Sequence, residues 1–275
     1  MATIAITGAT SGIGEAAAVA LAAQGHRILV IGRDGDRGAA ALARVELAGP
    51  GGGHRLYLAD LSQVREARRL ADAIARDHPG LDVLANNAGA IFARREETAE
   101  GLERTFALDH MGAWALTDAL LPTLRGNSAR VVTTSSAAHW GGRVDPADWQ
   151  LHRGWGSWRA YCNAKLMNVL FTCALARREP ALTAVCFHPG FIRSRFGTKA
   201  NGMAGLGGVA QRLFARSPER GAETLVHLAA APLPDRPALY WAGRKPARTS
   251  AQARDDALAD QLWADSARFV EEIAG

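Results

Sequence analysis

The chain has 275 residues, of which 48% are hydrophobic and 21% are charged, and its formal net charge is +5. This length suits one large domain, and this composition is ordinary for a soluble globular protein. The basic residues are scattered rather than gathered into a stripe with interleaved aromatic residues, so the sequence does not favour nucleic-acid binding.

Short apolar runs alternate with helical patterns from the start of the chain. Most of the runs are apolar throughout, as expected for parallel strands that are covered on both faces. The predicted strands are 3–7, 27–32, 54–58, 81–86, 130–135 and 183–188. The predicted helices are 12–24, 36–47, 62–77, 101–121, 158–178, 218–230 and 251–273. This order predicts an α/β fold with a doubly wound parallel sheet of about seven strands and helices on both faces, forming a single domain over residues 1–275.

A glycine-rich turn joins the first predicted strand to the first predicted helix. It reads TGATSGIG over residues 7–14, with glycines at 8, 12 and 14. These glycines let the backbone turn tightly and approach a pyrophosphate, whose charge meets the helix N-terminus. No Lys-Ser or Lys-Thr follows, so a P-loop is disfavoured. The position of the turn favours a dinucleotide site over a purely structural turn.

The second predicted strand ends at Gly32 and Arg33. An acidic residue at position 32 would accept a hydrogen bond from the 2′-hydroxyl of NAD. The Arg33 guanidinium can instead pair with a 2′-phosphate, which favours NADP(H) over NAD(H). Asp34 lies nearby and counts against this preference, and an exposed loop charge is the alternative interpretation of Arg33.

Tyr161 and Lys165 stand four residues apart in a predicted helix and therefore share one of its faces. The chain has only three lysines, the others being Lys199 and Lys245, and it otherwise uses arginine for positive charge. An ammonium beside a tyrosine favours the phenolate and lowers the tyrosine pKa. The pair is typical of a proton donor at a carbonyl, and a solvated helix face is the alternative.

Several motifs in a fixed order resemble those of the short-chain dehydrogenase/reductase family, whose fold is of the Rossmann type. They are the 7–14 turn, Asp60-Leu61, Asn86-Asn87-Ala88-Gly89, Tyr161-x-x-x-Lys165 and His188-Pro189-Gly190. The retinol-dehydrogenase and protochlorophyllide-reductase-like branch is more similar still. That likeness rests on Ser135-Ser136-Ala137-Ala138-His139 and on the long step from Ser136 to Tyr161.

The resemblance implies a role for each matching residue. Residues implied to bind the cofactor are Gly8, Ser11, Gly12, Ile13, Gly14, Arg33, Asp60, Leu61, Asn87, Ala88, Gly89, Tyr161, Lys165, Pro189, Gly190, Ile192 and Ser194. Tyr161 is implied to be the acid/base, with Ser136 on the substrate oxygen and Lys165 on the nicotinamide ribose.

Asp109 is a departure from the family, which has a catalytic asparagine at this place. In relatives the backbone carbonyl of that asparagine holds a water that links the lysine to solvent, and aspartate keeps the carbonyl. The carboxylate adds negative charge near Lys165 and opposes the lowering of the tyrosine pKa. A tolerated near-isostere and altered chemistry are the two interpretations.

The substrate end is rich in aromatic residues. Four of the seven tryptophans (Trp140, Trp149, Trp155 and Trp158) fall between Ser136 and Tyr161. They either line an apolar pocket or pack an irregular insertion. The expected substrate contacts are Ser136, Trp140, Trp155, Phe191 and Phe196, and residues 191–216 are expected to form a substrate-binding loop or lid.

The sequence therefore predicts an NADP(H)-dependent oxidoreductase that transfers hydride between nicotinamide and a carbonyl or alcohol of a hydrophobic small molecule. The alternatives are a non-redox lyase or cyclase, for which Asp109 is the main indication, and a cofactor-binding protein without turnover. The histidines have no metal-ligand spacing, so no metal is expected. Relatives pair through the tyrosine-bearing helices, so a homodimer is also considered.

Composition bears on location. The three cysteines form neither a metal pattern nor a disulfide framework, and no signal peptide or membrane-length apolar run is evident. A cytoplasmic protein without a membrane anchor is expected, and the alanine- and arginine-rich bias favours a bacterial source.

Overall fold

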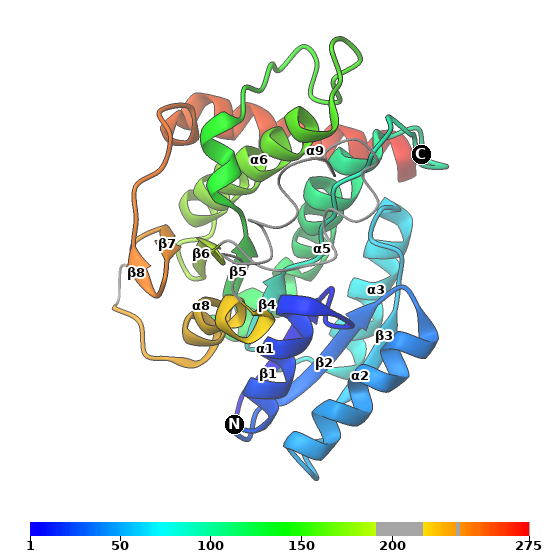
Figure 1. Cartoon of the computed structure of the whole chain (residues 1–275), viewed down its shortest axis with the longest axis vertical. Helices are drawn as coiled ribbons and strands as arrows, with labels where there is room; N and C mark the ends of the chain where they lie inside the picture. The colour runs from blue at the N-terminus through cyan, green and yellow to red at the C-terminus, as the bar shows by residue number, and fades with distance from the viewer. Residues whose placement is uncertain (191–216, 235–236, 275) are drawn as a thin grey trace.

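The computed structural model describes residues 1–190, 217–234 and 237–274, and within them eight strands form one sheet. The strands are β1 (Thr3–Thr7), β2 (Arg27–Gly32), β3 (Arg55–Leu58), β4 (Val83–Asn86), β5 (Arg130–Thr134), β6 (Thr183–His188), β7 (Tyr240–Ala242) and β8 (Lys245–Pro246). Their order is β3-β2-β1-β4-β5-β6-β7-β8, and all pairs are parallel except β7 with β8 (Figure 1). One sheet thus carries every described strand, which confirms the predicted fold class.

Helices cover both faces of this sheet. They are α1 (Gly12–Ala22), α2 (Gly35–Ala48), α3 (Val64–Asp77), α4 (Arg104–Phe106), α5 (Gly112–Gly126), α6 (Ser157–Arg178), α8 (Pro218–Ala230) and α9 (Asp256–Ala274). The 3₁₀ turns η2 (Ala137–Gly141) and η4 (Gln252–Arg254) and the π turn η1 (Ala107–Met111) complete the described elements.

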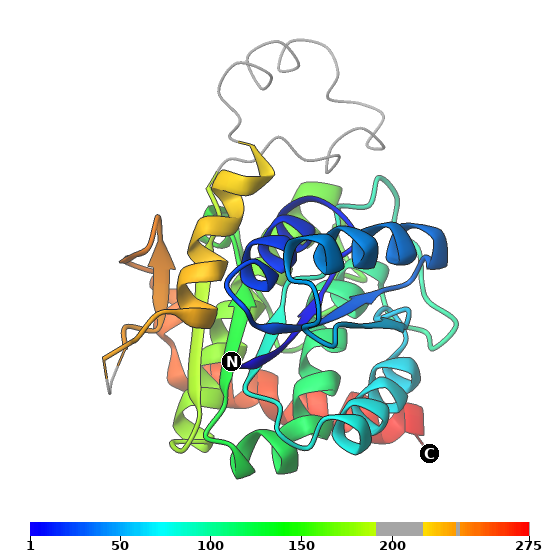
Figure 2. The same ribbon diagram turned by 90° about the horizontal axis from the view of Figure 1, so that it is seen from below.

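The strands are apolar throughout because each one is buried on both sides. In β2, Ile28 and Val30 pack with α1, α2 and α8, whereas Leu29 and Ile31 pack with α3, α5 and α6. All four side chains are fully buried. This alternation follows from the period of two along a strand, and it gives the two helical layers seen in Figure 2.

The carboxyl ends of β1, β4, β5 and β6 lie at one edge of the sheet because these strands are parallel neighbours. The chain order reverses at β1, with β2 and β3 on one side and β4 and β5 on the other. In open α/β sheets such a reversal marks the crevice in which ligands bind. The fold therefore places the segments after these four strands around one site.

A single helix over residues 101–121 was predicted, and this prediction is wrong in detail. The helix begins at Arg104, where the buried Glu103 carboxylate accepts the Phe106 N–H at 2.8 Å. Between α4 and α5 the chain forms η1, a five-residue π turn that contains Asp109. π turns place one extra residue in a helix and are frequent at functional sites.

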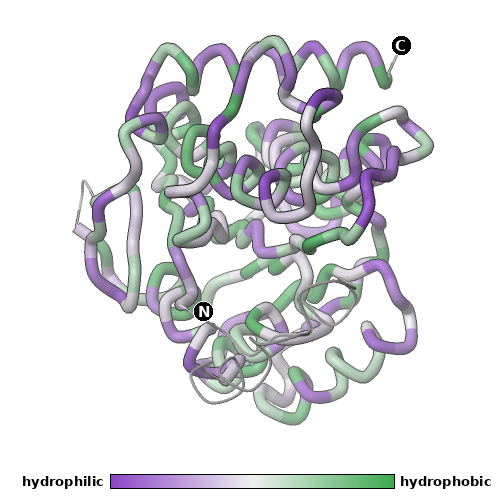
Figure 3. Tube along the Cα trace, turned by 45° about the horizontal axis from the view of Figure 1, so that its top comes forward, coloured by the Kyte–Doolittle hydropathy of each residue, from purple (hydrophilic) through white to green (hydrophobic). Residues whose placement is uncertain are grey.

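Helix α9 lies along the outside of α6 (Figure 1). Its Trp263 ring stacks on Phe171 of α6, with centroids 5.9 Å apart, and also meets Trp114 of α5 at 5.4 Å. Hydrophilic and hydrophobic segments alternate along this helix in Figure 3, as expected for a helix with one buried stripe. The outer face of the tyrosine-bearing helix is therefore covered by the chain itself.

Candidate active site

The turn after β1 needs glycine at two kinds of position. Gly8 and Gly12 have φ angles of +66° and +58°, a left-handed backbone that favours glycine. A side chain at Gly14 would come within 2.5 Å of the Asn87 amide nitrogen. The turn leads into α1, whose first turn receives no hydrogen bond from the exposed Ser11 side chain. This arrangement fits a pyrophosphate at the helix N-terminus.

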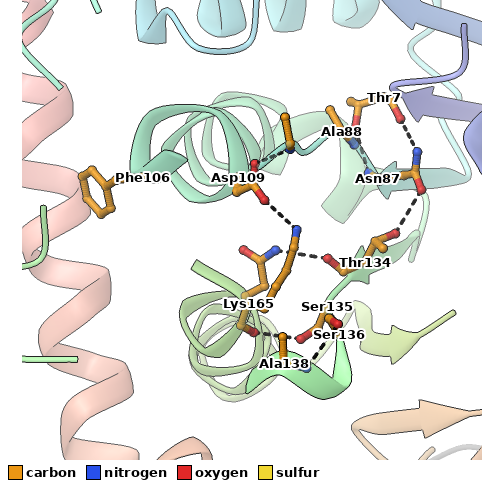
Figure 4. A network of polar contacts seen from close by, with 12 residues as sticks. Thr7, Asn87, Ala88, Phe106, Asp109, Thr134, Ser135, Ser136, Ala138 and Lys165 are labelled. Atoms are coloured by element: carbon orange, nitrogen blue, oxygen red, sulfur yellow. Dashed lines mark hydrogen bonds and ion pairs between the residues drawn. The ribbon is translucent and has the colours of Figure 1, made fainter. Parts of the chain in front are cut away.

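Asn87 ties three strand ends together (Figure 4). Its side-chain N–H donates to the Thr7 carbonyl at 3.0 Å, and its oxygen accepts from Thr134 Oγ1 at 3.3 Å. The backbone N–H groups of Asn87 and Ala88 both donate to Thr7 Oγ1, at 2.8 and 2.9 Å. The predicted cofactor residues after β4 are thereby held rigidly beside the glycine turn.

The residues at the end of β2 are those predicted to distinguish between the two forms of a nicotinamide cofactor. A side chain at Gly32 would overlap the Thr10 methyl group, so Thr10 would have to move to admit any larger residue at position 32. Asp34 caps α2 by accepting the Arg37 N–H at 3.0 Å, and it pairs with the Arg37 guanidinium at 3.1 Å. The backbone hydrogen bond from Arg37 holds the pKa of Asp34 below its ordinary value. Arg33 is exposed.

The remaining predicted cofactor residues surround the same edge. Asp60 accepts two hydrogen bonds from Ser62, from its N–H at 3.0 Å and its hydroxyl at 2.8 Å, and Leu61 is buried. Pro189 and Gly190 follow β6, where Gly190 has a φ of +93°. Phe191, Ile192, Ser194, Phe196 and the predicted 191–216 lid lie outside the described residues.

Ser136, Tyr161 and Lys165 come together from two elements. Ser136 precedes η2 and accepts the Ala138 N–H at 3.2 Å, while Tyr161 and Lys165 lie one turn apart on α6. The Lys165 ammonium is 5.3 Å from the centre of the Tyr161 ring. Ser135 Oγ donates to the Lys165 carbonyl at 2.7 Å, which fastens α6 to the end of β5.

Asp109 forms a direct ion pair with Lys165, with 2.9 Å between carboxylate and ammonium (Figure 4). The exposed fractions of the two side chains are only 3% for Lys165 and 0% for Asp109. The other carboxylate oxygen accepts the Ala90 N–H at 2.8 Å. A side chain at Gly89 would lie 2.9 Å from the carboxylate and 3.0 Å from the ammonium, so this glycine leaves room for the pair.

Burial and this pair shape the pKa values of the site. Burial raises the pKa of Tyr161; Lys165 opposes the rise, and Asp109 adds to it. A hydrogen bond with Ser136 also lowers the pKa of Tyr161. Burial lowers the pKa of Lys165, but Asp109 and Tyr161 together more than offset this, so the pKa of Lys165 is raised overall. The pKa of Asp109 is raised by burial and lowered by Lys165, with a net rise. Asp109 thus partly cancels the effect of the Lys165 charge on the pKa of Tyr161.

The four tryptophans between Ser136 and Tyr161 have two different environments. Trp149 is buried and donates its indole N–H to Asp265 of α9 at 2.8 Å, and Trp155 donates to Glu103 at 3.1 Å. Trp140 and Trp158 are 52% and 59% exposed. The Trp158 ring contacts Tyr161, with centroids 5.6 Å apart. Packing of an insertion therefore explains two of them, and the other two lie open beside the site.

Glu103 was not singled out from the sequence. It is buried and accepts hydrogen bonds from Thr105, Phe106 and Trp155. Glutamate is not among the residues that usually cap a helix, so its place before α4 gave no signal. Trp158 was named among the four tryptophans but not among the expected substrate contacts, although its place three residues before Tyr161 predicts that the two rings share a helix face.

Comparison with known proteins defines the class. Residues 2–204 match the family described as short chain dehydrogenase. The chain therefore belongs to this family, whose members are oxidoreductases that act on alcohol or ketone groups with a nicotinamide cofactor.

Individual relatives cover nearly the whole chain. A protein of Streptomyces sp. (strain C5) that carries the name daunorubicin C-13 ketoreductase DnrU is 37% identical over 281 residues, which is 99% of this chain and 93% of its own. Human retinol dehydrogenase 13 is 34% identical over 283 residues, covering 98% and 84%. These relatives agree with the retinol-dehydrogenase-like branch predicted from the motifs.

Solved structures agree on the fold. A protein of Mycobacterium paratuberculosis superposes with a TM-score of 0.79 at 32% identity and covers 98% of this chain and 94% of its own. An alcohol dehydrogenase of Thermococcus sibiricus, complexed with 5-hydroxy-NADP, gives a TM-score of 0.67 at 21% identity, with 88% and 95% covered. The second likeness concerns the fold alone.

Neither a metal site nor a membrane-spanning helix is found among the described residues. They contain no group of three or more histidine, cysteine or acidic side chains placed to hold a metal ion. Over the same part of the chain, no helix combines the length and the apolar character that crossing a membrane requires.

Proposed function

We propose that the protein is an NADP(H)-dependent oxidoreductase that interconverts a carbonyl and an alcohol on a hydrophobic small molecule, with Tyr161 as the acid/base. The observation that carries this proposal is the convergence of Ser136, Tyr161 and Lys165 beside the glycine turn. A bound nicotinamide would supply the hydride for reduction of the carbonyl carbon, and Tyr161 would give its proton to the carbonyl oxygen. Ser136 donates to that oxygen as negative charge develops on it.

The preference for NADP(H) is supported by three residues at the end of β2, Gly32, Arg33 and Asp34. Thr10 fills the space beside Gly32, and Asp34 is engaged in capping α2. Arg33 is exposed, and the described contacts give its side chain no comparable capping role. Its guanidinium matches the geometry of a phosphate. Gly8, Gly12 and Gly14 would hold the pyrophosphate, and Lys165 would bind the nicotinamide ribose.

A bulky apolar substrate is supported by Trp140 and Trp158. Large exposed aromatic side chains next to a candidate acid/base are typical of a ligand site rather than of ordinary surface. The cytoplasm is the proposed location, since Cys162, Cys173 and Cys186 are all free thiols.

The decisive experiment replaces Tyr161 by phenylalanine. NADPH consumption is followed against a panel of aromatic and aliphatic ketones and aldehydes, and NADPH binding is measured by fluorescence. We expect Tyr161→Phe to lower kcat by roughly 100-fold or more while NADPH binding stays nearly unchanged. A mutant that reduces carbonyls at the wild-type rate refutes the role of Tyr161. A wild-type enzyme that binds NADPH but reduces nothing in the panel favours the lyase, cyclase or non-turnover alternatives.

A further inference from the structure

The contact between Asp109 and Lys165 bears on the protonation state of Tyr161. Tyr161 must carry its proton to act as an acid on a carbonyl, and it must be a phenolate to take a proton from an alcohol. A lysine ammonium alone favours the phenolate. Here that ammonium lies 2.9 Å from a fully buried carboxylate.

We propose that Asp109 is a positioning residue that acts through Lys165 to keep Tyr161 protonated at neutral pH, so that the phenolate needed for alcohol oxidation forms only at higher pH. The proposal rests on the proposed function, because it concerns the same tyrosine. It assigns to Asp109 a control over the protonation of Tyr161 that family membership does not supply.

The geometry makes Asp109 more than a nearby charge. Its two oxygens are engaged separately, one by Lys165 and the other by the Ala90 N–H at 2.8 Å. The π turn η1 directs the side chain inward, and the missing side chain at Gly89 allows the contact. Carboxylate and ammonium are therefore held together by three separate parts of the backbone.

Burial is the largest influence that raises the pKa of Tyr161, and Asp109 is the largest charged one. Lys165 and the Ser136 hydroxyl favour the phenolate, whereas burial, Asp109 and the neighbouring Cys162 thiol disfavour it. Glu103, which precedes α4, acts on Asp109 itself and raises its pKa. Asparagine in place of Asp109 keeps the shape and a hydrogen-bonding oxygen but removes the charge.

The first measurement follows Tyr161 directly. Ultraviolet absorbance of the phenolate is titrated in the wild type and in Tyr161→Phe, and the difference isolates Tyr161 from Tyr57 and Tyr240. The same difference is then taken in an Asp109→Asn background. We expect the Asp109→Asn titration to lie about one pH unit or more lower. Coincident titrations overturn the proposal, and this readout needs neither substrate nor cofactor.

The second measurement uses turnover. In Asp109→Asn, the pH at which kcat/KM for alcohol oxidation reaches half of its maximum should lie about one unit lower than in the wild type, because the phenolate of Tyr161 then forms at lower pH. A change in kcat/KM without a shift of the pH profile assigns Asp109 a merely structural role and refutes the proposal.

Asp118→Asn is the matched control. Asp118 lies on the neighbouring helix α5, its pKa is also raised by burial, and its charged neighbours are Arg68, Arg125 and Glu179 rather than Lys165. Its substitution should leave both pH profiles in place. If Asp109→Asn does not fold, Asp109→Ser removes the same charge in a smaller side chain and carries the same expectation. Absence of all carbonyl reduction by wild type would count against the proposed function, while the absorbance titration still decides the role of Asp109.

Discussion

Arg33 is the residue on which the proposed preference for NADP(H) over NAD(H) depends. Its two neighbours already have structural contacts: Gly32 packs against Thr10, and Asp34 caps α2. An exposed guanidinium is available for a planar, paired contact with phosphate oxygens, which lysine cannot reproduce. The chain uses arginine for almost all of its positive charge, so position rather than residue type is the informative feature.

Replacement of Arg33 by alanine should weaken NADPH binding by roughly 10- to 100-fold, the range expected for a hydrogen bond to a charged group. NADH binding should change little, because NADH has no 2′-phosphate. Fluorescence titration with both cofactors measures this, and the exposed Arg55 of β3 provides the control variant Arg55→Ala. Comparable wild-type affinities for the two cofactors would contradict the preference for NADP(H).

At the scale of single elements, η1 directs two adjacent side chains to different neighbours. Asp109 contacts Lys165 of α6, whereas His110 Nε2 lies 2.9 Å from the Ser266 hydroxyl of α9. Both side chains are buried, with exposed fractions of 1% each. One short turn therefore connects the candidate catalytic lysine to the C-terminal helix.

Burial lowers the pKa of His110 to about 3, so the folded protein keeps this imidazole neutral. Between an ordinary value of 6.5 and about 3, the unfolded chain binds a proton at His110 that the folded chain does not. The stability that depends on the neutral form is therefore present above pH 6.5 and is lost as the pH falls toward 3.

In urea unfolding between pH 6 and pH 4, His110→Gln should show a shallower loss of stability than the wild type. The difference in slope should approach about 1.4 kcal/mol per pH unit, the value for one proton. The exposed His152 provides the control His152→Gln, which should keep the wild-type slope. Equal slopes in all three proteins would show that His110 is protonated without unfolding.

Sequence patterns predicted the elements whose cause is local. The limits of β1, β2 and β6 agree with the prediction, because unbroken apolar runs end where the strand leaves the core. Helix α8 also agrees, since Ser217 caps it by accepting the Arg220 N–H and Pro218 occupies its first turn. The π turn, β7 and β8 were missed because they depend on contacts with distant parts of the chain, which periodicity does not record.

The same reasoning separates the parts of the site. The Tyr161–Lys165 pair follows from helical spacing alone, and the glycine turn follows from its place between strand and helix. The direct ion pair of Asp109 needs Gly89 and η1 together, so sequence left its role open between two interpretations. Glu103 was missed because a buried carboxylate and a surface one look alike in a sequence.

At the scale of the whole molecule, α9 joins parts of the chain that are far apart in sequence. The Asp265 carboxylate accepts a hydrogen bond from Trp149 of the insertion, and the Ser266 hydroxyl is hydrogen-bonded to His110. The Trp263 ring stacks on Phe171 of α6. A dimer that pairs through the outer face of α6 would have to displace these contacts. The homodimer considered from the resemblance remains a prediction, and the position of α9 argues against pairing through this helix.

We expect the wild-type protein to be monomeric at micromolar concentration when its mass is measured by light scattering after gel filtration. Leu262→Ala, at a fully buried position of α9, should cost about 2–5 kcal/mol of unfolding free energy and should promote self-association by loosening α9 from α6. Leu47→Ala, at an 84% exposed position, should change neither property. A stable wild-type dimer with cross-links between the two α6 helices would contradict this expectation.

The extra residue in η1 also limits how this part of the chain can change in evolution. Each residue of an α-helix advances the chain by about 100° around the axis. Removing one residue from Ala107–Met111 would leave a regular α-helix, but it would rotate α4 relative to α5 by about that angle. The turn would carry Glu103 away from Trp155 and Asp109 away from Lys165. The number of residues in this turn is therefore fixed by the geometry on both sides.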